Sequence, residues 1–258
     1  MRTVAAVLNL AVAAVLAAGC HSPAEPRAKA AEPTFSALSD IHAEPVAPRA
    51  AVGALFLGAT DTHTCTASIV HSPGKDLILT AAHCLAAGLP ATFVPGFNES
   101  AAPGDVWTVG AVYLDPRWIS TQDPKADYAF ARVSRPAGGA VETVAGQALT
   151  LGTAGPGAVT VIGYPMGDGG PPLGCDTVAR VDDGYPTLRC NGLVDGTSGG
   201  PWLRAATVIG VTGGRNGGGC EDSVSYSSPF DAAPAALLAR AEAGGPGDDA
   251  PQSFDSEC

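Results

Sequence analysis

The sequence predicts an all-β protein of sandwich or barrel type, and three observations support that prediction. Glycine (33 residues) and proline (22 residues) are spread along the 258-residue chain, which leaves little room for long helices. Short apolar runs of the β type recur from Val52 onward, each bounded by Gly, Pro, Asp or Asn. No helical pattern separates these runs, so a βαβ arrangement is not expected.

The N-terminus predicts export. Arg2 precedes an apolar run from Val4 to Ala18, which is too short to span about 30 Å of hydrocarbon. A charged start, an apolar middle and a small-residue end are typical of a signal peptide over residues 1–20. The run Leu16-Ala17-Ala18-Gly19-Cys20 resembles a bacterial lipoprotein box, in which Cys20 would be lipidated. Ordinary cleavage nearby, giving a secreted protein, is the alternative.

Residues 21–48 are rich in Pro, Ala and Glu, which predicts a linker or a propeptide. A single domain is expected over residues 49–243. Its candidate strands are Val52–Leu57, Cys65–Val70, Leu77–Ala81, Val106–Leu114, Tyr128–Val133, Val159–Gly163 and Val208–Thr212.

One helix is expected near the C-terminus. Asp231 is a suitable N-cap, and the segment from Ala232 to Ala243 is rich in Ala, Leu, Arg and Glu before a Gly-Gly-Pro stop. The remaining residues 244–258 form an acidic tail, which we expect to be mobile apart from Cys258.

Composition excludes several classes of protein. Hydrophobic residues make up 46% of the chain and charged residues 15%, so bulk disorder is not expected. The net charge of −11 would repel nucleic acid. No later stretch is long and apolar enough to span a membrane, so membrane attachment is expected only through Cys20. Seven cysteines indicate disulfides and an oxidising compartment.

Two segments carry residues suited to nucleophilic chemistry. In Leu79–Cys84 a strand ends in His83, and in Gly196–Pro201 a serine, Ser198, stands among small and turn-forming residues. Flanking glycines allow a tight turn that exposes the hydroxyl and aims amide N–H groups at a reacting oxygen. A serine needs a neighbouring base, and a histidine base needs a carboxylate that fixes its tautomer.

Each segment alone has a simpler interpretation. His83 could be a core histidine or a zinc ligand, and Gly196–Pro201 could be an ordinary turn. The pattern G-x-S-x-G also fits an esterase-type nucleophile elbow, but that fold needs a histidine after the serine. All five histidines precede Ser198. The cysteines and histidines lack the spacing of a structural zinc site, so no metal or cofactor is expected.

Taken together, the segments resemble the chymotrypsin/trypsin-like serine peptidase family, in particular the bacterial branch that includes glutamyl endopeptidases. The resemblance spans about residues 52–243. It is carried by the strand Cys65-Thr66-Ala67-Ser68, the histidine block Leu79–Cys84, the block Asp127-Tyr128-Ala129-Phe130-Ala131, Gly163-Tyr164-Pro165, Gly196–Trp202 and Tyr226-Ser227-Ser228-Pro229.

The resemblance implies a fold and a set of roles. The fold is two packed antiparallel six-stranded β-barrels (chymotrypsin-like) with the site between them and a C-terminal helix. His83, Asp127 and Ser198 would form the catalytic triad, with the amides of Gly196 and Ser198 as the oxyanion hole. Asp123 is a rival carboxylate, but it lies in a Gln-Asp-Pro turn, whereas Asp127 opens an apolar strand.

Two departures from the family pattern affect activation and specificity. Thr197 stands where many members have the aspartate that pairs with a freed N-terminus, so activation by that switch is not expected. The resemblance places Gly192 at the base of the specificity pocket and Thr212, Gly213 and Gly214 along its wall. Without a carboxylate at the base and with an open mouth, this pocket favours a larger apolar side chain.

Six cysteines besides Cys20 allow 15 pairings from the residues alone. The resemblance supports Cys65–Cys84 and Cys175–Cys190, and the pair that then remains is Cys220–Cys258. We therefore expect an exported, monomeric serine endopeptidase that acts on protein or peptide substrates without a cofactor. A catalytically silent protease-fold module for binding or adhesion at the cell surface is the alternative.

Overall fold

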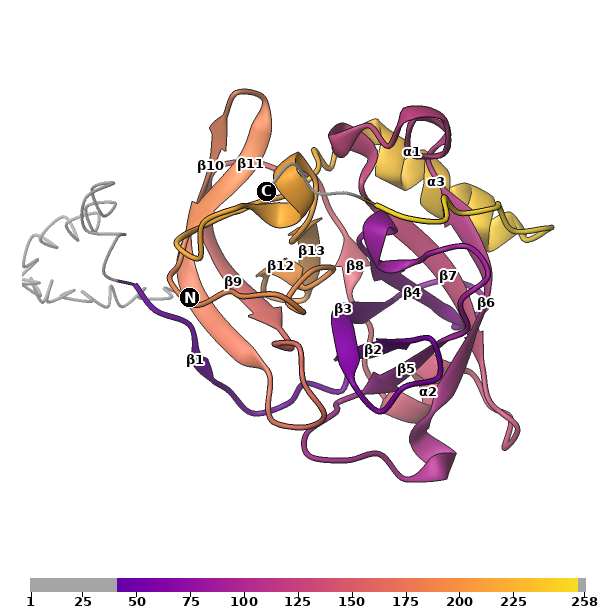
Figure 1. Ribbon diagram of the computed structural model, residues 1–258. Coiled ribbons are helices and arrows are strands. Elements are labelled where there is room, and N and C mark those ends of the chain that lie inside the picture. The colour runs from indigo at the N-terminus through magenta and orange to yellow at the C-terminus, as the bar shows by residue number, and fades with distance from the viewer. Residues whose placement is uncertain (1–40, 255–258) are drawn as a thin grey trace, which may run out of the picture. The chain divides into compact units, whose positions relative to one another are not determined.

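The computed structural model describes residues 41–254 (Figure 1). The predicted export signal, Cys20, the linker up to residue 40 and Cys258 lie outside the described residues. The Cys220–Cys258 pairing and the lipidation of Cys20 therefore remain predictions.

The first half of the domain is a closed, six-stranded antiparallel barrel. Its strand order is β2-β3-β4-β7-β6-β5, and β5 closes back onto β2 (Figure 1). Large apolar side chains such as Leu55, Ile69, Phe93 and Trp107 are fully or almost fully buried in it. The strands are β2 (Val52–Leu57), β3 (His63–Val70), β4 (Leu77–Thr80), β5 (Ala91–Pro95), β6 (Trp107–Leu114) and β7 (Ala129–Ser134).

The second half is an eight-stranded sheet in which seven strands follow the order β14-β11-β10-β9-β12-β13-β8 and β1 pairs with β10. One apolar cluster contains side chains from both halves, among them Phe130 of the barrel and Val208 of the sheet. The strands are β1 (Glu44–Pro45), β8 (Thr150–Leu151), β9 (Gly157–Gly163), β10 (Leu173–Asp182), β11 (Tyr185–Arg189), β12 (Pro201–Arg204), β13 (Thr207–Val211) and β14 (Val224–Tyr226).

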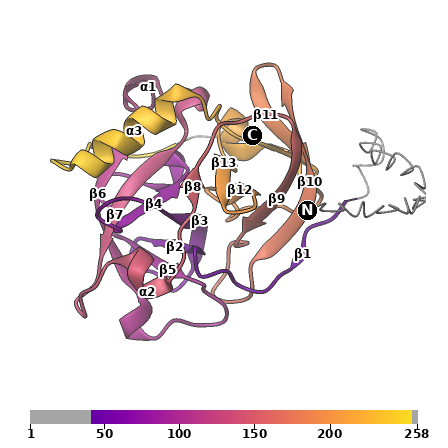
Figure 2. The same cartoon turned by 180° about the vertical axis from the view of Figure 1, so that it is seen from behind.

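Within residues 41–254, three α-helices accompany the strands: α1 (Pro116–Thr121), α2 (Val141–Ala145) and α3 (Ala232–Ala243). The predicted C-terminal helix is confirmed with its predicted cap, since the Asp231 carboxylate accepts a hydrogen bond from the Ala233 amide at 2.8 Å. Although α3 follows the second sheet in sequence, it lies beside β6 and β7 of the first barrel (Figure 2). The Arg132 side chain of β7 donates to the Ala241 carbonyl of α3 at 2.7 Å.

The predicted all-β architecture is confirmed, with differences in detail. All seven predicted strands are present within one or two residues of their expected bounds. The second half, however, is an eight-stranded sheet by its hydrogen-bonding pattern rather than a closed six-stranded barrel. The additional short helix α1 begins at Pro116 and is capped by Asp115, whose carboxylate accepts from the Arg117 amide.

The described chain on both sides of the predicted domain is hydrogen-bonded to it. Residues 44 and 45 pair with β10, and His42 bridges to Asn191, so the segment from 41 to 48 belongs to the second sheet. The tail after α3 runs along the first barrel, where the Asp248 carboxylate accepts from the Leu114 amide at 2.7 Å. Backbone hydrogen bonds join both segments to the domain, from the Ala43 amide to the Asn191 carbonyl at 2.8 Å and from the Asp248 amide to the Val112 carbonyl at 2.7 Å.

Two predicted disulfides are confirmed, Cys65–Cys84 and Cys175–Cys190. Disulfides form in oxidising compartments, so these two indicate an exported or extracellular protein. Across residues 41–254, no helix has both the length and the apolar composition needed to cross a bilayer.

Candidate active site

His83 is fixed at the end of a barrel strand. Strand β4 ends at Thr80, and a single 3-10 turn over Ala82–Cys84 follows it. The disulfide between Cys84 and Cys65 ties this turn to β3. Both neighbours of His83 in the turn are buried, and its imidazole contacts Asp127 and lines a cleft.

Asp127 reaches His83 through strand pairing rather than through proximity in sequence. Strands β4 and β7 are antiparallel, and Thr80 lies opposite Ala129. The residues that follow β4 and those that precede β7 therefore lie at the same end of the barrel. Asp127 is two residues before Ala129, which brings its carboxylate to His83 across 44 positions of sequence.

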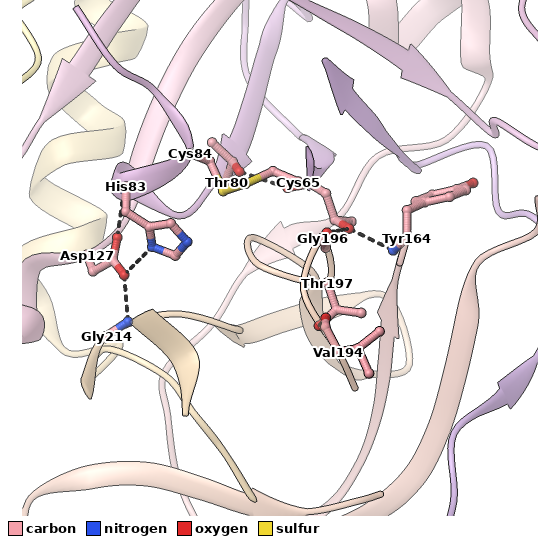
Figure 3. The surroundings of a disulfide bond; sticks show 11 residues. Cys65, Thr80, His83, Cys84, Asp127, Tyr164, Val194, Gly196, Thr197 and Gly214 are labelled. Carbon is pink, nitrogen blue, oxygen red and sulfur yellow. Dashed lines mark hydrogen bonds and ion pairs between the residues drawn. A yellow bond between two sulfur atoms is a disulfide. The ribbon is translucent and has the colours of Figure 1, made fainter. Parts of the chain in front are cut away.

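The carboxylate of Asp127 is fully buried and accepts three hydrogen bonds (Figure 3). His83 contributes two of them, from its backbone amide at 2.9 Å and from ring Nδ1 at 2.7 Å. The Gly214 amide donates the third at 2.7 Å. Since an ionised carboxylate can only accept, Nδ1 carries the proton, and Nε2 of the neutral ring is left as an acceptor.

A glycine beside this carboxylate keeps space for it. A Cβ atom on Gly213 would lie 2.9 Å from an oxygen of Asp127 and 3.2 Å from the Ala81 side chain. A larger residue at this position would displace the carboxylate or the loop. Gly213 and Gly214 thus support Asp127, a role that the sequence did not indicate.

The loop that carries Ser198 depends on two glycines in the left-handed region of backbone conformation. Gly196 has a φ of 91° and Gly199 a φ of 78°. A Cβ on Gly196 would lie 2.1 Å from the Met166 amide nitrogen, and one on Gly199 would lie 2.1 Å from the Thr66 carbonyl oxygen. Backbone strain and lack of space therefore both require glycine on each side of the serine.

Thr66 joins this loop to the first barrel. Its hydroxyl donates to the Gly196 carbonyl at 3.0 Å and accepts from the Tyr164 amide at 2.8 Å. Its own amide donates to the Ser198 carbonyl at 2.7 Å. Thr66 is fully buried, and the Thr80 hydroxyl donates to its carbonyl at 2.7 Å. No role was predicted for Thr66 from the sequence, although it lies within the strand that carries Cys65.

The turn before Ser198 is stabilised locally. Both the amide and the hydroxyl of Thr197 donate to the Val194 carbonyl, at 3.1 and 2.8 Å. Among the hydrogen bonds of the described residues, none is donated by the amide of Gly196 or of Ser198. Two neighbouring N–H groups beside the serine hydroxyl are thus available to a bound oxygen.

His83 and Ser198 line the same cleft, which has a volume of about 400 Å³. The described residues that line it include three carboxylates and no Lys or Arg. These acidic residues are Asp195, Glu221 and Asp222.

Of the four residues predicted to form the specificity pocket, Thr212 lines this cleft. Gly213 and Gly214 instead contact Asp127, as described above. Gly192 has a φ of 86°, and its amide donates to the Asp222 carbonyl at 3.1 Å. Its neighbour Leu193 supplies the lining there.

A polar network around the buried residues Asp115 and Tyr128 braces α1 next to the site. The Asp115 carboxylate accepts from the Tyr128 hydroxyl at 2.6 Å and from the Arg117 side chain at 2.8 Å. Burial alone would raise the pKa of Asp115, but the hydrogen bonds from Arg117 and Tyr128 lower it to about 2. The carboxylate therefore stays ionised, and it fixes Tyr128 directly beside Asp127.

One group of potential metal ligands lies at the site. Ligand atoms of Cys65, His83 and Cys84 lie within 4.8 Å of one another. The two sulfur atoms are bonded to each other, so they are not available as thiolate ligands.

Comparison with known proteins agrees with the fold. The family model described as "Trypsin-like peptidase domain" matches residues 65–211. No curated protein matches the chain. Among solved structures, the protease Anisep from Arthrobacter nicotinovorans has a TM-score of 0.68 at 24% identity and covers 78% of this chain and 100% of its own.

Two further solved structures are similar. The thermostable serine protease AL20 from an extremophilic microorganism has a TM-score of 0.65 at 21% identity, covering 76% of this chain and 98% of its own. A Glu endopeptidase in complex with MPD has a TM-score of 0.63 at 19% identity, covering 80% and 98%. The chymotrypsin-like fold implied by the sequence resemblance is thereby confirmed.

Proposed function

The chain belongs to the trypsin-like peptidase domain family, and on that premise we propose that it is a serine endopeptidase with His83, Asp127 and Ser198 as its catalytic triad. The observation that carries this proposal is the hydrogen bond between the buried carboxylate of Asp127 and His83, at a cleft that Ser198 also lines. With Nδ1 bonded to Asp127, the Nε2 atom of His83 is a base of the correct tautomer.

The reaction follows from these positions. Ser198 Oγ attacks the carbonyl carbon of the peptide while His83 Nε2 takes the hydroxyl proton. His83 then gives that proton to the leaving amine, which produces an acyl-enzyme on Ser198. Water, deprotonated by the same nitrogen, attacks the ester carbonyl. The bond from the acyl carbon to Ser198 Oγ then breaks, Oγ takes the proton back from His83, and the second product leaves. Asp127 stabilises the imidazolium formed in each step.

The amides of Gly196 and Ser198 are proposed as the oxyanion hole. Neither amide donates a hydrogen bond within the described residues. The hydroxyls of Thr66 and Thr197 donate to the Gly196 and Val194 carbonyls and so stabilise the loop that carries Ser198. Preorganised donors of this kind typically lower a barrier by about 3 kcal/mol each, because they need no rearrangement when charge develops.

A serine-reactive fluorophosphonate tests the proposal. Labelling of the wild type at Ser198, loss of label and of peptide hydrolysis in Ser198→Ala, and no change in Ser120→Ala are expected. Ser120 is an exposed serine on α1 and serves as the matched control. If the folded, disulfide-intact wild type takes no label, the protein is instead a non-catalytic module with a protease fold.

We further propose that the enzyme is exported and anchored through a lipid on Cys20, with residues 21–40 as a spacer. The support is the signal-like N-terminus together with the two disulfides. Wild type and Cys20→Ala, expressed in a bacterial host with a palmitate analogue, distinguish the outcomes. The wild type should carry label and sediment with membranes, whereas equal release of both forms into the medium would show a plain secreted enzyme.

A further inference from the structure

The C-terminal tail is built into the side of the candidate active site. After α3 it runs back across the first barrel (Figure 1) and is hydrogen-bonded at four points along its length. Its partners come from β6, from the loop after His83 and from the end of α1. The bonds are Tyr113 Oη to the Gly245 carbonyl (3.1 Å), the Leu114 amide to the Asp248 carboxylate (2.7 Å), the Ala87 amide to the Pro251 carbonyl (3.1 Å) and Gln122 Nε2 to the Ser253 carbonyl (2.6 Å).

This path brings Phe254 against the proposed general base. Its ring stacks on the imidazole of His83, with centroids 5.1 Å apart and planes 24° apart. It also contacts the buried Trp118 of α1, with ring centroids 5.4 Å apart. One face of the imidazole is therefore covered by an aromatic ring from the far end of the chain.

Phe254 lines the cleft but does not fill it. The cleft that contains His83 and Ser198 retains about 400 Å³ with Phe254 on its wall. An inhibitory plug would occupy that space, so the geometry favours a permanent wall. The hydrogen bonds along the tail support the same conclusion, because they hold the segment before Phe254 against β6, the loop after His83 and the end of α1.

We propose that Phe254 is a specificity-determining residue, a wall that restricts the substrate side chain lying against His83 to small residues. The proposal rests on the proposed peptidase function, since it requires a peptide in the cleft. A substrate that reaches Ser198 must pass the imidazole, and the stacked ring takes the space beside it. A bulky side chain at that one substrate position would collide with Phe254.

A digest of a peptide library with mass-spectrometric readout tests this wall. The wild type should tolerate only small residues at one position near the cleaved bond. Phe254→Ala should accept bulky aromatic residues there, with a gain in relative kcat/KM of about tenfold, a typical cost for misfit in a pocket. Preferences at the other substrate positions should not change. Ser253→Ala, an exposed neighbour on the same tail, is the matched control.

Two further measurements separate the possible failures. Fluorophosphonate labelling reports whether the serine is reactive, independently of any subsite. If wild type and Phe254→Ala are labelled equally and show the same profile at every position, the wall proposal is wrong while the peptidase function stands. No label and no cleavage by the wild type would overturn both. Should Phe254→Ala not fold, Phe254→Leu carries the same test, with partial widening expected at that position.

Discussion

Replacing Asp127 by asparagine keeps the size of the side chain but cannot satisfy its three donors. The carboxylate accepts from the His83 amide, from His83 Nδ1 and from the Gly214 amide. An asparagine has one accepting oxygen and one donating NH₂ group. In one orientation the NH₂ group opposes the Gly214 amide and forces His83 Nδ1 to accept. In the other it opposes the His83 amide.

Both orientations are costly. The first gives the tautomer with the proton on Nε2, which cannot take the proton of Ser198. The second keeps the useful tautomer but leaves a buried amide without an acceptor, which costs about 1–3 kcal/mol. Neither supplies the negative charge that stabilises the imidazolium. We expect kcat/KM to fall about 10⁴-fold, equivalent to about 5.5 kcal/mol of barrier, in a protein that still folds.

The matched control is Asp123→Asn. Asp123 caps a short turn by accepting from the Lys125 amide at 2.9 Å, and asparagine caps such turns equally well. Peptide hydrolysis with thermal unfolding of the same samples separates activity from stability. An Asp127→Asn enzyme that keeps more than about a tenth of wild-type kcat/KM, or an Asp123→Asn change that is more damaging, would refute the reasoning.

Three further predictions concern stability, activation and specificity. Burial lowers the pKa of His63 below 6.5, and the Gly169 backbone and the Asp168 charge oppose this effect. Because the unfolded chain then binds a proton more readily than the folded protein, the free energy of unfolding should fall as the pH drops below 6.5. His63→Phe should flatten that dependence in urea titrations at pH 5 and 8. Because Thr197 cannot receive a new α-amino group, chains extended before residue 41 should remain active in the peptide assay, and inactivity of every extended form would contradict this. Because three carboxylates line the cleft, peptides with Lys or Arg beside the cleaved bond should be cleaved in preference to peptides with an apolar residue there. Neutralising all three carboxylates should reduce that preference about tenfold, at about 0.5 kcal/mol each. An unchanged preference would contradict the role of these carboxylates and favour the apolar pocket predicted from the sequence.

Five of the six strands of the first barrel were predicted, and the clearest of them, β2 and β4, are runs of apolar residues. Strand β5 was not among the predicted strands. All the side chains of residues 77–80 and 129–131 are buried, and helix α3 packs beside β7. Strand β10 lacks such a run. Its buried residues are small or polar, including Cys175, Thr177 and Ala179, and they alternate with Asp176 and Arg180. Hydrophobic pattern alone therefore could not identify it.

The tail illustrates a different limit. Its acidic, glycine-rich composition is typical of a mobile segment, and no local pattern indicates where it goes. Its position depends on partners more than a hundred residues away, such as the Leu114 amide for Asp248. Phe254 was the only residue whose type indicated that the tail packs against the domain, because a large apolar side chain is unusual in a solvated segment.

Strand pairing explains why Asp127, and not Asp123, reaches His83. The sequence favoured Asp127 because it opens an apolar strand, and the β4–β7 register explains why that criterion is physically sound. With Thr80 opposite Ala129, only a residue close to the start of β7 can reach a histidine close to the end of β4. Asp123 lies six positions before Ala129 and is separated from it by the turn that it caps. The carboxylate is thus selected by an antiparallel pairing, which sequence patterns indicate only indirectly.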